Sequence, residues 1–284
     1  MILSQALQSA TQALLKAGIA DASIEAELLL GSVLGMSKTQ LYTEPERDLT
    51  RTETKRLGRL VQRRLNREPT AYILRRCEFF GIEFYVDCDA FIPRPETEVL
   101  VEGAIKLAHH LAQRKEQIEI ADIGTGCGAI AISLALAMPQ AKIYATDISA
   151  SALKVAQVNC RRYGVNGRVE LLQGDLLEPL PQPVDMVVAN LPYIKDCEFA
   201  DLSPEIINFE PRIALTGGKD GLDKIHRMLE QISEKLDSGG FFLLEIGWRQ
   251  GEAVTALVRS YFPCASIRLI SDLGGIDRVV EAVL

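Results

Sequence analysis

The sequence predicts an α/β fold, in which a mostly parallel sheet carries helices on both faces, preceded by a small all-helical domain. Three observations lead to this prediction. The first 75 residues repeat apolar side chains at the three- and four-residue spacing of helices. From about residue 91 onward, short apolar runs alternate with amphipathic stretches, as in parallel strands joined by helices. Charge divides in the same way: residues 1–75 hold 11 Lys or Arg against 8 Asp or Glu, whereas residues 76–284 hold 20 against 30.

The first domain, residues 1–75, is expected to contain about four helices. Gly18 and Gly35 punctuate the first helical stretches. Thr50 and Glu53 have the spacing of a capping box, so the last helix is expected to begin there and to end before Pro69. Its basic side chains form either a solvated helix face or a docking surface for an acidic or nucleic-acid-bound partner: Arg51, Lys55, Arg56, Arg59, Arg63, Arg64 and Arg67.

Residues 76–90 are aromatic and partly alternating, which predicts a hairpin linking the helical domain to the sheet domain of residues 91–284. Within the sheet domain, strands are expected at 118–123, 141–147, 169–173, 184–190, 241–247 and 279–284. Amphipathic helices are expected near 97–112, 128–138, 149–163, 222–237 and 250–261. Such alternation places helices on both faces of the sheet.

Composition excludes several classes of protein. With 284 residues, 48% hydrophobic and 24% charged, the chain is long and apolar enough to bury a core, which excludes a disordered or fibrous protein. A net charge of −7 argues against a DNA-wrapping protein or an anionic-membrane binder. The six cysteines form no CxxC pair and have no histidine at ligand spacing, so we expect reduced thiols, no disulfides and no metal site. Neither a signal peptide nor a membrane-spanning run is visible, so a cytoplasmic protein is expected.

A glycine-rich turn follows the strand predicted at 118–123. Gly124, Gly126 and Gly128 would let the backbone approach a ligand at the carboxyl edge of the sheet. Asp147 ends the next predicted strand, where a carboxylate can accept both hydroxyls of a ribose. The pair indicates an adenosine-containing cofactor. The glycine spacing with Ala129 also satisfies the permissive dinucleotide fingerprint, and a tight turn without a ligand is the simpler alternative.

The tetrapeptide Asn190-Leu191-Pro192-Tyr193 follows the strand predicted at 184–190. An asparagine oxygen and a backbone carbonyl held by proline can together accept both hydrogens of a planar NH₂ group, while a tyrosine ring lies against its π-face. This favours a site for an amide or an exocyclic amine over an ordinary strand-end turn.

These segments resemble the class I S-adenosylmethionine-dependent methyltransferases, which have a Rossmann-like seven-stranded sheet. Further segments resemble the HemK/PrmC family of release-factor glutamine N5-methyltransferases: 67–69, 72–73, 91–98, 209–212, 214–215, 217–218, 220–222 and 244–247. The resemblance extends from about residue 67 to the C-terminus, and the helical domain agrees in position and size. Leu191 stands where the family usually has proline, a variant that also resembles the adenine dimethyltransferases of ribosomal RNA.

The resemblance implies S-adenosylmethionine as cofactor, S-adenosylhomocysteine as product, and residue roles as follows. Cofactor-binding residues would be Gly124, Thr125, Gly126, Cys127, Gly128, Asp147, Asp175, Leu176 and Asn190, with Asp175 and Leu176 facing the adenine. Asn190, Leu191, Pro192 and Tyr193 would bind the substrate, and Asn190, Pro192 and Tyr193 would act in catalysis. The substrate would be the glutamine of the Gly-Gly-Gln motif of peptide chain release factors, recognised by the helical domain, with the enzyme a monomer.

Two alternatives are kept. The first is an adenine-N6 methyltransferase of RNA or DNA, favoured by the tetrapeptide and the arginine-rich helix. The acidic sheet domain argues against it, as does the lack of a further basic and aromatic run for gripping a strand. The second is a non-catalytic adenosine-ligand module, which would predict a disrupted tetrapeptide, whereas Asn190 and Tyr193 are present.

Overall fold

A computed structural model describes all residues, 1–284, as two compact units. The first unit comprises Met1–Arg75 together with Ser203–Phe209, and the second comprises Arg76–Leu202 together with Glu210–Leu284. The predicted hairpin, β1 (Cys77–Phe79) and β2 (Ile82–Phe84), is present and belongs to the second unit. No helix of either unit is both long and apolar enough to cross a membrane.

The first unit is entirely helical, as the sequence predicts. Its helices are α1 (Leu3–Lys16), α2 (Ala22–Leu34), α3 (Lys38–Thr43), α4 (Arg51–Leu65), α5 (Thr70–Leu74) and α9 (Pro204–Phe209). Leucine and alanine side chains from α1 and α2 fill most of its core. The predicted capping box is confirmed, because the Thr50 hydroxyl accepts from the Glu53 amide at 3.2 Å while the Glu53 carboxylate accepts from the Thr50 amide at 2.8 Å.

The arginines of α4 and of the turn that follows it fall into two groups, which corrects their interpretation as one basic surface. Arg64 is 6% exposed and pairs with Glu25 and, at 2.9 Å, with Glu205. Arg63 pairs with Glu68, and Arg67 pairs with Glu205 at 3.2 Å. These three guanidinium groups are therefore occupied within the unit. The exposed basic side chains that remain on α4 are Arg51, Lys55, Arg56 and Arg59.

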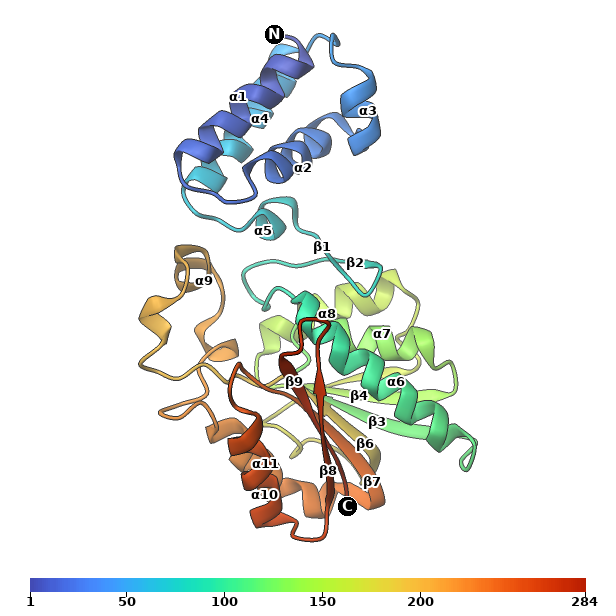
Figure 1. Ribbon diagram of the computed structural model, residues 1–284. Coiled ribbons are helices and arrows are strands. Elements are labelled where there is room, and N and C mark those ends of the chain that lie inside the picture. The colour runs from blue at the N-terminus through green and yellow to red at the C-terminus, as the bar shows by residue number, and fades with distance from the viewer. The chain divides into compact units, whose positions relative to one another are not determined.

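The second unit contains a seven-stranded sheet (Figure 1). Its strand order is β5 (Val169–Gln173), β4 (Ala141–Asp147), β3 (Ile118–Ile123), β6 (Val184–Ala189), β7 (Leu236–Glu245), β9 (Asp277–Val283) and β8 (Ser266–Ser271). The strands from β5 to β7 pair in parallel, whereas β9 is antiparallel to both β7 and β8. This confirms the predicted mostly parallel sheet. The edge strand β8 was not expected, and β7 begins five residues earlier than expected.

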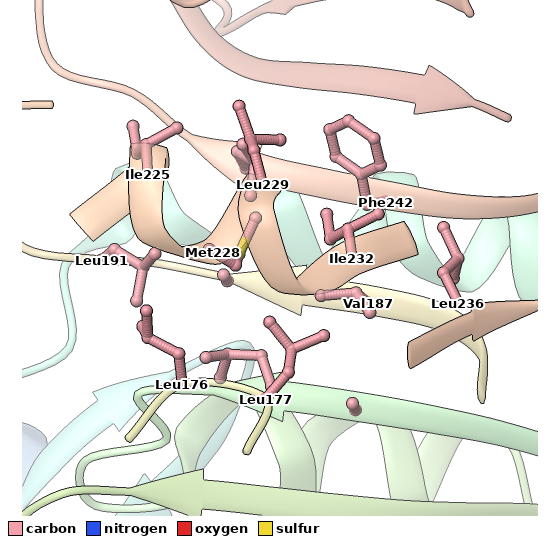
Figure 2. Packing of buried hydrophobic residues seen from close by; sticks show 14 of the residues in the cluster. Leu176, Leu177, Val187, Leu191, Ile225, Met228, Leu229, Ile232, Leu236 and Phe242 are labelled. Atoms are coloured by element: carbon pink, nitrogen blue, oxygen red, sulfur yellow. The ribbon is translucent and has the colours of Figure 1, made fainter. Parts of the chain in front are cut away.

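Helices cover both faces of this sheet (Figure 1). They are α6 (Glu98–Ala112), α7 (Ala129–Ala137), α8 (Ala150–Arg162), α10 (Asp223–Lys235) and α11 (Gly251–Tyr261). Side chains alternate along β7, so Leu243 lies beside Gly103 of α6 while Leu244 joins the core formed with α10 and α11. Leu176 and Leu191 are both buried in that second core, together with Met228 of α10 (Figure 2).

Candidate active site

The strand register brings the carboxyl ends of four strands into one row. Ile123 of β3 is paired with Thr146 of β4 and with Ala189 of β6, and Ala189 is paired with Leu244 of β7. The next residue along each strand is therefore Gly124, Asp147, Asn190 and Glu245. The chain order reverses between β3 and β6, and ligands of open α/β sheets bind outside the carboxyl ends at such a switch point.

The predicted cofactor loop, Gly124–Gly128, is held by Asp147. The Gly126 amide donates to one oxygen of the Asp147 carboxylate, and the Ser149 amide donates to the other, both at 2.8 Å. Gly126 has φ of +57°, and nothing lies within 4 Å of the position that a Cβ would take. The backbone at Gly126 is thus open to a ligand, as the glycine spacing predicts.

The buried carboxylate of Asp122 stabilises the loop Gly124–Gly128 from its inner side. Asp122 is inaccessible to solvent and accepts from the Thr125 hydroxyl at 2.7 Å and from the Ala131 amide at 3.1 Å. Burial raises its pKa to about 7, against the lowering effect of these two donors, and its Oδ1 atom has no hydrogen-bond partner. The fixed position of Asp122 ties the turn to the start of α7.

Thr125 and Cys127 present mainly backbone to the loop surface, because their side chains are buried. Burial raises the pKa of the Cys127 thiol to about 12, so this cysteine is neutral and unreactive. The backbone carbonyl of Cys127 accepts from the side-chain Nδ2 atom of Asn159 at 2.9 Å. The loop is therefore held in shape by contacts on its inner side.

Asp147 keeps acceptor capacity for a ligand. Burial raises the pKa of its carboxyl group, and the backbone amides of Ser149, Gly126 and Ile148 oppose that shift. Each carboxylate oxygen can accept more than one hydrogen bond, so two ribose hydroxyls can still donate to it. Hydroxyl donors at this position would further favour the ionised form.

The residues predicted to face the adenine have other contacts in the structure. Asp175 forms an ion pair with Arg227 of α10. Leu176 has φ of +51°, is 8% exposed, and accepts through its carbonyl from the Thr146 hydroxyl at 2.8 Å. Its side chain packs in the core (Figure 2). Both residues follow β5 beside the end of β4, and their contact with an adenine ring stays a prediction.

The predicted acceptor segment, Asn190–Tyr193, leaves two oxygen atoms unpaired within the chain. The Asn190 Nδ2 atom donates to the Thr97 hydroxyl at 3.1 Å, whereas its Oδ1 atom accepts no hydrogen bond. The Leu191 carbonyl also accepts none, although the Leu191 side chain is buried against the core. These two acceptors have the chemistry predicted for binding the two hydrogens of an NH₂ group.

Glycines let the backbone close around the acceptor segment. A Cβ added at Gly217 would lie 2.4 Å from the Pro192 oxygen, and one at Gly221 would lie 2.3 Å from the Tyr193 oxygen. Gln250 donates to that same Tyr193 oxygen at 3.1 Å and accepts from the Gly247 amide at 2.7 Å. The segment is thus fixed from two sides.

Tyr193 contacts the carboxylate of Glu245, which was not among the predicted site residues. Its hydroxyl donates to Oε1 of Glu245 at 3.4 Å, and its own pKa is raised, chiefly by burial and also by the Glu245 charge. Glu245 is 3% exposed, and burial raises its pKa to about 7. The signal available in the sequence was an acidic residue at the carboxyl end of a predicted strand.

Family models match both units of the chain. A model of the PrmC N-terminal domain matches residues 5–74, and a model described as methyltransferase small domain matches residues 98–219. A release factor glutamine methyltransferase of Koribacter versatilis is 39% identical over 282 residues, covering 99% of this chain and 98% of that protein. A protein of the same name from Moorella thermoacetica is 40% identical over 279 residues, with 98% and 97% covered.

One solved structure with a similar fold is the hMettl16 catalytic domain in complex with the MAT2A 3′UTR hairpin 1. Its TM-score is 0.57 and its sequence is 14% identical, with 85% of this chain and 83% of that chain covered. At this identity the similarity concerns the fold alone.

Proposed function

Because the chain belongs to the family of release factor glutamine methyltransferases, we propose that it methylates the glutamine of the Gly-Gly-Gln motif in peptide chain release factors. The methyl group comes from S-adenosylmethionine and is transferred to the side-chain amide nitrogen, N5. A C–N bond forms as the methyl–sulfur bond breaks, the nitrogen releases one proton, and S-adenosylhomocysteine remains.

The observation that carries this proposal is the row of strand ends. It places the cofactor loop and Asp147 beside an acceptor segment whose Asn190 Oδ1 atom and Leu191 carbonyl have no partner within the chain. Two acceptors side by side suit the two hydrogens of a primary amide. No serine or cysteine nucleophile paired with a histidine is needed, because the transfer is direct.

The residues present fit S-adenosylmethionine. The open backbone at Gly126 gives the cofactor room, and Asp147 offers acceptors to the ribose hydroxyls. Thr125 and Cys127 would contribute through their backbone, and Asp175 with Leu176 would border the adenine. When bound, the cofactor supplies a sulfonium methyl group that is already strongly electrophilic.

The protein must therefore act on the amide, whose nitrogen lone pair is delocalised into its carbonyl. Asn190 and the Leu191 carbonyl accept the two N–H hydrogens, which orients the lone pair in line with the methyl group and favours loss of planarity. Pro192 fixes the backbone that presents the Leu191 carbonyl. The Tyr193 ring, anchored through its hydroxyl to Glu245, borders the amide plane.

The helical unit is proposed to recognise the release factor. Its exposed basic side chains Arg51, Lys55, Arg56 and Arg59 suit an acidic surface. Since release factors act on the ribosome, we infer that the reaction takes place in the cytoplasm. We also infer that a monomer suffices, because both predicted binding sites lie within one chain.

Single-turnover methyl transfer tests the function. Wild type and Asn190→Ala are offered a release factor, RNA and DNA in parallel, with mass spectrometry locating the methyl group. We expect methylation of the Gly-Gly-Gln glutamine by wild type and a rate about 10²-fold or more lower for Asn190→Ala, with similar cofactor affinity. Methyl on adenine and none on glutamine would support the adenine-N6 alternative and contradict the proposal.

A further inference from the structure

Thr97 occupies a position where threonine normally caps a helix, yet its hydroxyl is used elsewhere. It is the last residue of the 3-10 turn η1 (Pro95–Thr97) and the N-cap of α6, and its side chain makes no capping hydrogen bond. The side chain is 3% exposed and accepts from Nδ2 of Asn190 at 3.1 Å. The hydroxyl therefore serves the acceptor segment and not the helix.

The segment that precedes Thr97 is itself held in place by contacts with Glu210. Arg94 forms an ion pair with the buried carboxylate of Glu210, which also accepts from the Ile92 amide at 3.4 Å. These contacts join two segments that are 116 residues apart in the chain. The segment that leads into Thr97 is thereby fixed within the second unit.

The hydrogen bond between Asn190 and Thr97 has a defined direction in the structure. The Nδ2 atom of Asn190 donates, and the Thr97 hydroxyl oxygen accepts. The other end of the acceptor segment is held separately, because the Tyr193 hydroxyl donates to Oε1 of Glu245 at 3.4 Å.

This direction decides which end of the Asn190 amide faces the substrate. With Nδ2 committed to Thr97, the Oδ1 atom is left free to accept from the glutamine NH₂ group. A rotated Asn190 amide would present its own NH₂ group to that of the substrate, and two donors would then face each other. Catalysis on an amide acceptor thus depends on a group that selects one of the two amide orientations.

We propose that Thr97 is a positioning residue for the methyl transfer, which holds the Asn190 amide in its observed orientation by accepting a hydrogen bond from Nδ2. This inference rests on the proposed function, because only an NH₂-bearing acceptor needs that orientation. Thr97 does not have to touch the substrate.

The test is a double-mutant cycle between Thr97 and Asn190. Thr97→Val removes the hydroxyl at nearly constant volume, and Thr97→Ser keeps it. Each is measured alone, and Thr97→Val is also combined with Asn190→Ala. The readouts are single-turnover transfer to a release factor, steady-state kcat and KM for that release factor, and the cofactor dissociation constant by calorimetry.

We expect Thr97→Val to lower kcat about tenfold or more while KM and the cofactor dissociation constant change less than about threefold. Thr97→Ser should recover most of the lost rate. In the Asn190→Ala background, Thr97→Val should cost nothing further, because the amide that it orients is gone. A purely structural role predicts equal losses in both backgrounds, and that result would overturn the inference.

Two outcomes separate failure of this inference from failure of the proposed function. If wild type methylates the release-factor glutamine and Thr97→Val does so equally fast, the inference alone is wrong. If wild type does not methylate that glutamine, both are wrong. Should Thr97→Val fail to fold, Thr97→Ala repeats the test, because it also removes the hydroxyl but adds no bulk.

Discussion

Gly217→Ala would add one Cβ atom directly behind the acceptor segment. That atom would lie 2.4 Å from the Pro192 oxygen and 2.7 Å from the Gly221 oxygen, whereas ordinary Cβ contacts begin at 3.4 Å. Both neighbours are backbone atoms, so no side chain can rotate away. The Pro192 carbonyl would have to move by about 1 Å to restore normal contact.

A displacement of about 1 Å at a reacting group typically lowers an enzymatic rate about 10²-fold. We therefore expect Gly217→Ala to slow methyl transfer to a release factor by about two orders of magnitude, with cofactor affinity nearly unchanged, since Asp147 and the cofactor loop lie on other strands. Overpacking should also lower the free energy of unfolding by about 1–3 kcal/mol.

Gly167→Ala is the matched control. Gly167 belongs to the same unit, has no positive φ, and has nothing within 4 Å of the position of an added Cβ. Its rate should equal that of wild type. Single-turnover kinetics, thermal melts and calorimetric cofactor titration distinguish the outcomes. A fully active Gly217→Ala enzyme would show that the acceptor segment does not need its observed position.

Three further substitutions test the site and the helical unit. Asp147→Ala should weaken S-adenosylmethionine binding by about 1.5–3 kcal/mol in calorimetry, and an unchanged dissociation constant would contradict its assignment to the ribose. Burial raises the pKa of Asp122 from 3.8 to about 7, so this group should destabilise wild type progressively as pH rises from about 4 to 7, in addition to the similar contribution of Glu245. Asp122→Asn should remove only the Asp122 contribution, at most about 4 kcal/mol, so the free energies of unfolding of the two proteins should diverge with pH in urea titrations without cofactor. Parallel pH curves for the two proteins would refute the shift. Arg64→Ala should lower the free energy of unfolding of the helical unit by about 2–3 kcal/mol, because it leaves Glu25 and Glu205 without their shared partner. The control Arg59→Ala, at an exposed position, should change that free energy by no more than about 0.5 kcal/mol. Equal effects of the two substitutions would show that the ion pairs are dispensable.

The inner strands of the parallel sheet were predictable because they are buried on both faces. The strands at 118–123, 141–147 and 169–173 were predicted with their observed bounds. β8 was missed because exposed and half-buried residues alternate along it and no continuous apolar run marks it.

The glycine loop, Asp147 and Asn190 could be selected as candidate site residues because each directly follows a strand or ends one. Glu245 was visible only as part of a strand, since its importance comes from cross-strand register with Asn190 and from contact with Tyr193. Likewise, a run of arginines on α4 does not reveal that Arg64 pairs with Glu205, 141 residues further along the chain. Local sequence patterns do not contain such pairings.

The pairing of Arg64 with Glu205 has a consequence for how the chain folds during its own synthesis. The helices of the first unit leave the ribosome early, but Ser203–Phe209, which belongs to that unit, emerges only after β3, β4, β5 and β6 have been made. Until then Arg64 lacks one of its two carboxylate partners. Vectorial synthesis therefore cannot complete the first unit before most of the sheet exists, and a fragment that ends at Arg75 would carry the same deficit permanently.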